Sequence, residues 1–135
     1  MAPTGTFRIR LDLRSGVPVY RQIIDQILGA IAGGALRGGE QLPTVRQLAV
    51  DLAINPNTVV RAYRELEIRG ILTTQQGTGT FITEKKIKPD EAERQRQLTQ
   101  MVSDLMARAG AAGFTARDVV ERLEEFLAEQ EKRRK

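Results

Sequence analysis

The sequence contains neither cysteine nor histidine, and these two absences exclude much of the usual chemistry of protein sites. Without cysteine there is no disulfide, no thiolate metal site and no cysteine nucleophile. Without histidine the commonest general base and the commonest ligand of transition metals are missing. No serine lies in a nucleophile-elbow pattern, and no phosphate-binding loop is present. We therefore expect a protein that is not an enzyme and holds no metal and no cofactor.

Aromatic residues are scarce, and long apolar runs are missing. Aromatics make up 4% of the 135 residues and tryptophan is absent, so no stacking platform for single-stranded nucleic acid stands out. Residues 1–14 have no apolar core of signal-peptide length, and no later stretch is apolar enough to span a bilayer. We expect a cytoplasmic protein that does not contact membranes.

The sequence does contain a moderate share of apolar residues and an excess of positive charge. Apolar residues make up 41% of the chain, which is enough for a small core, and the net charge is +4. Residues 1–83 hold nine arginines and no lysine against six acidic residues, whereas the remainder holds 12 basic and 11 acidic residues. A positive excess in the N-terminal part favours a polyanionic partner, although many unrelated proteins share such a balance.

The spacing of apolar residues predicts the first elements of the chain. Strict alternation of apolar and polar residues over 7–13 predicts a half-buried strand. From Val19 onward, apolar residues recur at helical spacing, and Gly33 and Gly34 are expected to end this helix. Residues 36–42 are polar and rich in glycine, which indicates a loop leading to a short strand.

Two more helices and a hairpin are predicted next. Thr44, followed three residues later by Gln47, has the pattern of a capping box at the start of a second helix. Asn55 is a suitable N-cap for a third helix, and Pro56 suits its first position, where a missing N–H has no cost. The runs I-L-T-T and T-F-I-T, separated by Q-Q-G-T-G, are typical of a β-hairpin.

The composition changes after Thr83. Residues 84–90 are predicted to be a charged linker, and residues 91–135 two amphipathic helices, the second capped by Thr115 with Asp118. Two apolar stripes cannot both be buried against a linker, so we expect the same pair of helices from a second subunit to cover them. The alternative is that the tail folds back on its own N-terminal domain. The residues expected at the dimer interface are Leu98, Met101, Val102, Leu105, Met106, Val119, Val120, Leu123, Phe126 and Leu127.

A helix, a short turn, a second helix and a hairpin follow one another in the order of a winged helix-turn-helix. The predicted fold is therefore mainly α with a small β-hairpin, in which a winged helix-turn-helix over residues 1–83 precedes a C-terminal two-helix dimerisation tail. The third helix, about 20 Å long, fits the major groove of DNA. Its apolar stripe must face the protein body, so the opposite face would meet DNA. That face carries Asn57, Thr58, Arg61 and Arg64.

These residue types suit the edges of the bases. Arginine can bind guanine through two hydrogen bonds, asparagine can bind adenine, and the threonine methyl can touch thymine. Arg46, near the start of the second helix, would lie close to a phosphate or to the edge of the groove. Taken singly, arginines such as Arg61 and Arg64 are more often ordinary solvated residues of a helix surface, and the alternative for Asn57 and Thr58 is that they serve only to start the helix. Their combination with two capped helices and a hairpin favours binding to double-stranded DNA.

Four segments make the sequence recognisable: P-V-Y-R-Q-I-I-D-Q-I, G-G-E-Q-L-P-T-V-R-Q-L-A, N-P-N-T-V-V-R-A-Y-R-E-L-E-I-R-G and G-T-G-T-F-I-T. Over about residues 17–83 the chain resembles the GntR family of bacterial regulators, and its short tail looks like that of the YtrA-type subgroup. The resemblance implies a homodimer that binds a two-fold symmetric operator, commonly to repress a nearby operon. In that subgroup the operon often encodes an ABC transporter.

The resemblance also implies which residues contact DNA. Positions in or beside the DNA-contacting helices match Arg46, Asn57, Thr58, Arg61 and Arg64, and the wing tip that approaches the minor groove matches Thr78, Gly79 and Thr80. The sequence departs from the family at Gly38, where proline is usual, and at Gln75 and Gln76, in a wing that is often basic. A neutral wing would release fewer counterions, which predicts a shallower salt dependence of binding.

A different class of function is a winged helix used only to bind another protein, since a fold does not settle a function. Such a face would be more apolar than one carrying Asn57, Arg61 and Arg64, so the DNA-binding interpretation is preferred. The sequence leaves open the operator, the regulated genes and the sign of regulation. It also leaves open whether a small-molecule effector binds, because no polar cluster in the tail marks a site for one.

Overall fold

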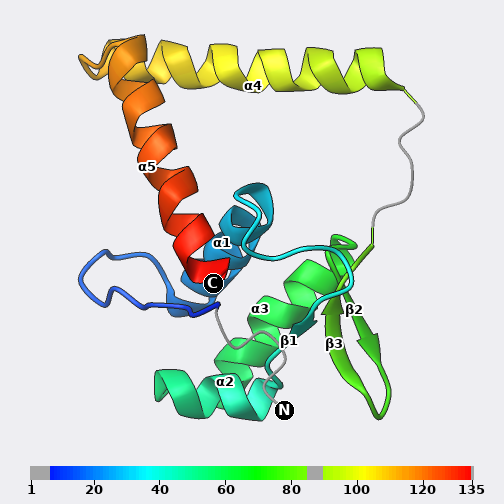
Figure 1. The fold of residues 1–135 in the computed structure, drawn as a ribbon. Helices are drawn as coiled ribbons and strands as arrows, with labels where there is room; N and C mark the ends of the chain where they lie inside the picture. The colour runs from blue at the N-terminus through cyan, green and yellow to red at the C-terminus, as the bar shows by residue number, and fades with distance from the viewer. Residues whose placement is uncertain (1–6, 85–89, 135) are drawn as a thin grey trace. The chain divides into compact units, whose positions relative to one another are not determined.

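The computed structural model describes residues 7–84 and 90–134 (Figure 1). They form two compact units, one made of residues 7–84 with 129–134 and the other of residues 90–128. The first unit contains α1 (Val19–Ala32), β1 (Gln41–Leu42), α2 (Val45–Leu52), α3 (Pro56–Ile68), β2 (Leu72–Gln75) and β3 (Gly79–Ile82). The second contains α4 (Glu91–Ala111) and most of α5 (Ala116–Arg134), whose last residues belong to the first unit.

The helix-turn-helix begins where the capping residues predict. Thr44 Oγ1 accepts a hydrogen bond from the backbone N–H of Gln47 at 3.0 Å, and Asn55 Oδ1 accepts one from Asn57 N–H at 2.8 Å. Each bond satisfies a backbone donor that the first turn of a helix leaves free. Ala53, with φ of 58°, ends α2 in the left-handed conformation and turns the chain toward α3. The predicted starts of α2 and α3 are therefore confirmed.

The wing is part of a three-stranded antiparallel sheet in the order β1-β3-β2. In the hairpin, Leu72 pairs with Ile82 and Gln75 pairs with Gly79. The short strand β1, which precedes α2, pairs with the edge of β3 that does not face β2. The mainly α winged fold with a small hairpin is confirmed, and so is the short strand predicted before the second helix, which joins the hairpin as β1.

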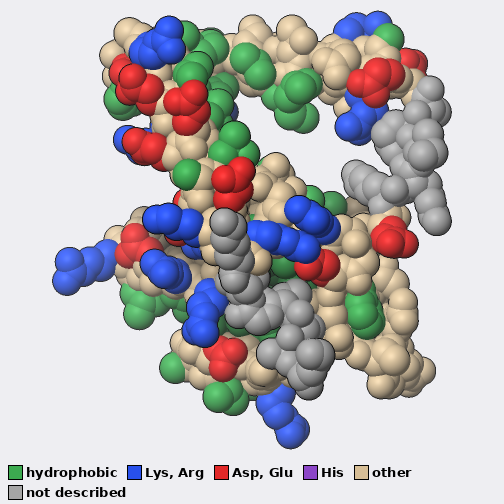
Figure 2. Space-filling view, viewed as in Figure 1, with side chains coloured by type: hydrophobic (Ala, Val, Ile, Leu, Met, Phe, Trp, Pro, Cys, Tyr) green, Lys and Arg blue, Asp and Glu red, His purple; other side chains and the backbone are tan. Residues whose placement is uncertain are grey.

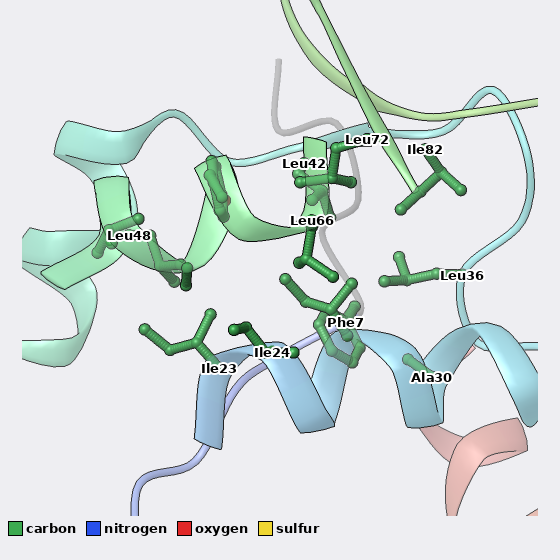
Figure 3. Packing of buried hydrophobic residues seen from close by; sticks show 14 of the residues in the cluster. Phe7, Ile23, Ile24, Ala30, Leu36, Leu42, Leu48, Leu66, Leu72 and Ile82 are labelled. Carbon is green, nitrogen blue, oxygen red and sulfur yellow. The ribbon is translucent and has the colours of Figure 1, made fainter. Parts of the chain in front are cut away.

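One hydrophobic core joins α1, α3 and the sheet (Figure 3). Ile23, Ile24 and Ile27 of α1 are at most 1% exposed, and they share this core with Val59 and Leu66 of α3, which are fully buried. Truncating a fully buried leucine or isoleucine in such a core typically costs about 2–5 kcal/mol. The inner face of α3 is thus fixed to the body of the domain, which leaves its outer face free for another partner.

The strand predicted over residues 7–13 is wrong. Phe7 is buried, as the alternation requires, but none of residues 7–13 belongs to a strand. The Gln26 side chain accepts from Arg10 N–H at 3.0 Å and donates to Arg10 O, and Gln22 Oε1 accepts from Asp12 N–H at 2.8 Å. Two glutamine amides of α1 therefore take the backbone hydrogen bonds that a neighbouring strand would otherwise provide.

The tail forms the two predicted helices. Thr115 and Asp118 make a complete capping box, because Thr115 N–H donates to Asp118 Oδ2 at 2.9 Å and Asp118 N–H donates to Thr115 Oγ1 at 3.2 Å. Of the predicted linker, residues 85–89 lie outside the described residues. None of the helices described is both long and apolar enough to cross a membrane.

The last residues of α5 pack within the first unit, to which they belong. Arg134 Nη1 donates to Glu40 Oε1 at 2.5 Å and to the carbonyl of Ala35 at 3.1 Å. The guanidinium of Arg133 lies over the ring of Phe7, 5.6 Å from its centroid. These contacts attach the last turn of α5 to Phe7 and to the segment that leads into β1.

Candidate nucleic-acid interface

The outer face of α3 carries the side chains that the sequence predicts to contact DNA. Asn57, Arg61 and Arg64 follow one another at intervals of four and three residues, so they lie on one side of the helix. All three are exposed, and they line one open hollow together with Val60, Glu65 and Ile68. Thr58 is half-buried at the border of this face. We call Asn57, Arg61 and Arg64 the polar face of α3.

The charges of this face are available to a ligand. The only acidic neighbour in the hollow, Glu65, forms an ion pair with Arg69 at 3.3 Å. Within residues 7–84 and 90–134, neither Arg61 nor Arg64 has a carboxylate within 4.0 Å, and the same is true of Arg46 in the first turn of α2. Guanidinium groups without an ion-pair partner suit phosphate and guanine, which both accept two parallel hydrogen bonds.

Arg61 has a neighbour that the sequence reasoning missed. Its guanidinium carbon lies 3.7 Å from the centroid of the Tyr20 ring. Tyr20 is the second residue of α1, so this contact joins α1 to the polar face of α3. No periodicity or capping pattern indicates a contact between residues so far apart in the chain.

The wing tip is held by a second contact that the sequence does not indicate. Gln41 of β1 donates from Nε2 to the carbonyl of Thr78 at 2.9 Å. Gly79 has φ of 131°, and a Cβ atom on it would overlap the Gln41 amide. The backbone conformation therefore favours glycine at this position, and a side chain here would displace the Gln41 amide from the carbonyl of Thr78.

The three residues predicted at the wing tip differ in exposure. Thr78 is exposed, whereas Gly79 and Thr80 are half-buried. The hydroxyl of Thr80 lies 3.4 Å from that of Thr74, which in turn contacts Glu67 of α3. The part of the wing that is free to meet a ligand is thus Thr78 with the exposed residues just before it, among them Gln76.

The chain resembles known proteins in both sequence and structure. Residues 19–82 match the model of the bacterial regulatory proteins of the gntR family. The chain is 36% identical to the HTH-type transcriptional repressor YtrA of Bacillus subtilis (strain 168) over 121 residues, which cover 90% of both chains. The chain belongs to the GntR family. It is a transcriptional regulator with a winged helix-turn-helix DNA-binding domain, and not an enzyme.

Two solved structures resemble this GntR regulator over most of its length. The YtrA protein of Sulfolobus acidocaldarius, a GntR-family transcription factor, is 33% identical, with a TM-score of 0.55 over 76% of this chain and 97% of that one. A transcriptional antiterminator from Listeria monocytogenes EGD-e is 26% identical, with a TM-score of 0.67 over 90% of each chain. The YtrA-type resemblance read from the sequence is confirmed.

In this GntR regulator a buried tyrosine links the two helices of the helix-turn-helix. Tyr63 of α3 is 4% exposed, and its hydroxyl donates to the carbonyl of Pro43 at 2.8 Å. Burial raises the pKa of Tyr63 above its ordinary value of 10.0, so the hydroxyl keeps its proton and remains a donor. Pro43 directly precedes Thr44, the N-cap of α2, and the bond therefore fixes where α2 starts relative to α3.

The predicted dimerisation residues form exposed apolar stripes on α4 and α5. The exposed fractions of Leu98, Met101, Val102 and Leu105 on α4 range from 37% to 64%. On α5, Val120, Leu123, Phe126 and Leu127 are 37–51% exposed, while Met106 and Val119 are half-buried. Figure 2 shows such hydrophobic side chains at the surface of both helices. Large apolar side chains gathered in this way are typical of protein interfaces.

Proposed function

We propose that this GntR regulator is a homodimeric repressor that binds a two-fold symmetric operator. The observation that carries the proposal is the polar face of α3, where two arginines that have no carboxylate partner among the described residues lie beside Asn57 on a helix whose other side is fixed in the core. A helix presented in this way fits the major groove, and each of these side chains can recognise a base edge.

The remaining predicted residues have supporting roles in this proposal. Arg46 lies in the first turn of α2, where its charge and the helix N-terminus both favour a phosphate. Thr58 offers its methyl group at the border of the polar face. Thr78 at the wing tip approaches the minor groove, held there by Gln41, while Gly79 and Thr80 maintain the shape of the wing.

The exposed stripes of α4 and α5 support a homodimer. A second copy offers the same stripes, so the two tails can cover each other and generate the two-fold axis that a palindromic operator requires. Replacing Leu123, which is 51% exposed, by aspartate places a charge in this interface. We expect Leu123→Asp to sediment as a monomer and to bind the operator much more weakly. Leu13, which is 80% exposed in the first unit, gives the matched control Leu13→Asp, which should stay dimeric. A wild-type protein that is already monomeric would contradict the proposal.

The resemblance to the YtrA-type subgroup suggests where to look for the operator. We propose that the regulated operon encodes an ABC transporter and that the protein acts in the cytoplasm, where the chromosome is accessible. The duplex to test first is the one directly upstream of the regulator's own gene, since the subgroup is expected to act on a nearby operon.

The decisive experiment is a fluorescence-anisotropy titration of that upstream duplex at near-physiological salt, with a scrambled duplex of equal length as control. We expect nanomolar binding that is at least about a hundredfold tighter than binding to the scrambled duplex. Equal weak binding to both duplexes would place the operator elsewhere in the genome or call for an effector. An absence of binding to either duplex at low salt would contradict DNA binding and favour a protein-interaction module.

A further inference from the structure

The contact between Tyr20 and Arg61 places an aromatic ring of α1 under a charged group of the polar face. The guanidinium carbon lies 3.7 Å from the ring centroid, well inside the distance of about 6 Å at which a cation is attracted to the face of an aromatic ring. Arg61 is exposed and lines the hollow on α3, so its side chain contacts Tyr20 and remains accessible to a ligand.

The ring is itself held in place by the core. Tyr20 is half-buried at the start of α1 and packs against the hydrophobic cluster. Three and four residues further on, Ile23 and Ile24 are buried in the core that α1 shares with α3. A ring at this position is therefore a fixed support, whereas an exposed arginine without one samples many rotamers.

A stacked guanidinium keeps its hydrogen-bonding edge free. At 3.7 Å from the ring centroid the guanidinium carbon is too close for an N–H group to point at the ring, so the flat face of the group lies over the ring and its N–H donors point outward. Within the described ranges no carboxylate lies within 4.0 Å of Arg61 to take these donors. The arrangement thus fixes the orientation of the side chain and leaves the edge that binds guanine or phosphate open.

We propose that Tyr20 is a positioning residue for operator recognition, because its ring holds the Arg61 guanidinium in the orientation that meets the DNA. The proposal rests on the DNA-binding function proposed above. It predicts that Tyr20 contributes to operator affinity only through Arg61, and that the aromatic ring, not the hydroxyl, is the part that matters.

The test is a double-mutant cycle measured by fluorescence anisotropy on the operator and on the scrambled duplex. The single variants are Tyr20→Leu, Tyr20→Phe and Arg61→Ala, and Tyr20→Leu is also combined with Arg61→Ala and with Arg64→Ala. We expect Tyr20→Leu to weaken operator binding by about threefold to tenfold. Tyr20→Phe should bind like the wild type. The effect of Tyr20→Leu should vanish beside Arg61→Ala and persist beside Arg64→Ala.

Each other outcome is decisive. A wild-type protein that binds neither duplex at low salt overturns the proposed function itself. If the wild type discriminates but Tyr20→Leu binds equally well, the positioning role is wrong. If Tyr20→Phe loses as much as Tyr20→Leu, the hydroxyl acts in place of the ring, and an equal loss beside Arg61→Ala means that Tyr20 acts independently. Tyr20→Met replaces the leucine variant if thermal unfolding shows that the latter is not folded.

Discussion

Replacing Tyr63 by phenylalanine removes a single hydroxyl from the junction between α2 and α3. The hydroxyl donates to the Pro43 carbonyl at 2.8 Å, and the ring around it is 4% exposed. Phenylalanine keeps the packing of the ring but leaves the carbonyl without this donor. Since Pro43 is itself half-buried, water can replace part of the lost bond, and we expect a loss of about 1 kcal/mol in the free energy of unfolding. For a chain of this length that corresponds to a decrease of about 3–5 °C in Tm.

The Tyr63 hydroxyl also makes the stability difference between the wild type and Tyr63→Phe depend on pH. Burial raises the pKa of Tyr63, so in the folded protein the group stays protonated at pH values where it ionises in the unfolded chain, which begins near its ordinary value of 10.0. The unfolded state then binds fewer protons than the folded state, and stability decreases as the pH rises. The contribution of Tyr63 is complete below pH 10.0 and is lost above it, by up to about 1.4 kcal/mol per pH unit. The advantage of the wild type over Tyr63→Phe should therefore disappear near pH 11.

The assay is urea unfolding of both proteins at one protein concentration, at neutral pH and at several values between about pH 9 and 11. Tyr20→Phe is the matched control, because Tyr20 is half-buried and its ring is engaged by Arg61. The control should unfold like the wild type at neutral pH. A difference between wild type and Tyr63→Phe that stays the same from neutral pH to pH 11 would refute the role of burial at Tyr63.

Two further predictions concern charged residues. We expect Arg61→Ala to cost about 1–3 kcal/mol of operator binding and to relax specificity at one position, whereas Arg46→Ala should weaken binding to all duplexes alike. Equal losses on operator and random duplexes would mean that Arg61 contacts only phosphate. Partial burial alone would raise the pKa of Glu40, but the hydrogen bonds and charges of Arg134 and Arg37 outweigh it and lower that pKa below 4.5. The ion pair between Glu40 and Arg134 should thus stabilise the folded protein above about pH 4.5, and this contribution should be lost as the pH falls further. Glu40→Gln should cost about 1 kcal/mol at neutral pH and nothing in acid, and a penalty that is the same in acid would contradict this reasoning.

The features that sequence reasoning predicts well are those that depend on neighbours in the chain. The side chains of Thr44, Asn55 and Thr115 each accept a hydrogen bond from a backbone N–H two or three residues further on, so a short sequence window contains both partners. The polar face of α3 is predicted for a similar reason. Helical periodicity assigns Val59 and Leu66 to the core and leaves Asn57 and its neighbours outside.

The extended segment at residues 7–13 shows where local patterns stop being informative. Alternation of apolar and polar residues reports which side chains are buried, and Phe7 is indeed in the core. It does not report what satisfies the backbone. Here the partner of Arg10 is the side chain of Gln26, 16 residues away on α1. A helix can therefore take the place of a second strand, and no feature within residues 7–13 distinguishes the two cases.

The contacts that orient the proposed DNA-binding surface also join residues that are far apart in the sequence. Tyr63 and Pro43 are 20 residues apart, Gln41 and Thr78 are 37 residues apart, and the Tyr20–Arg61 stack joins two different helices. Each is one hydrogen bond or one stack, so each adds little to the stability that the core provides. Each does fix the direction of an element that would meet DNA: the start of α2, the tip of the wing and the guanidinium on α3. Operator discrimination is therefore expected to be lost more readily than the fold, through contacts that no periodicity, capping or turn pattern indicates.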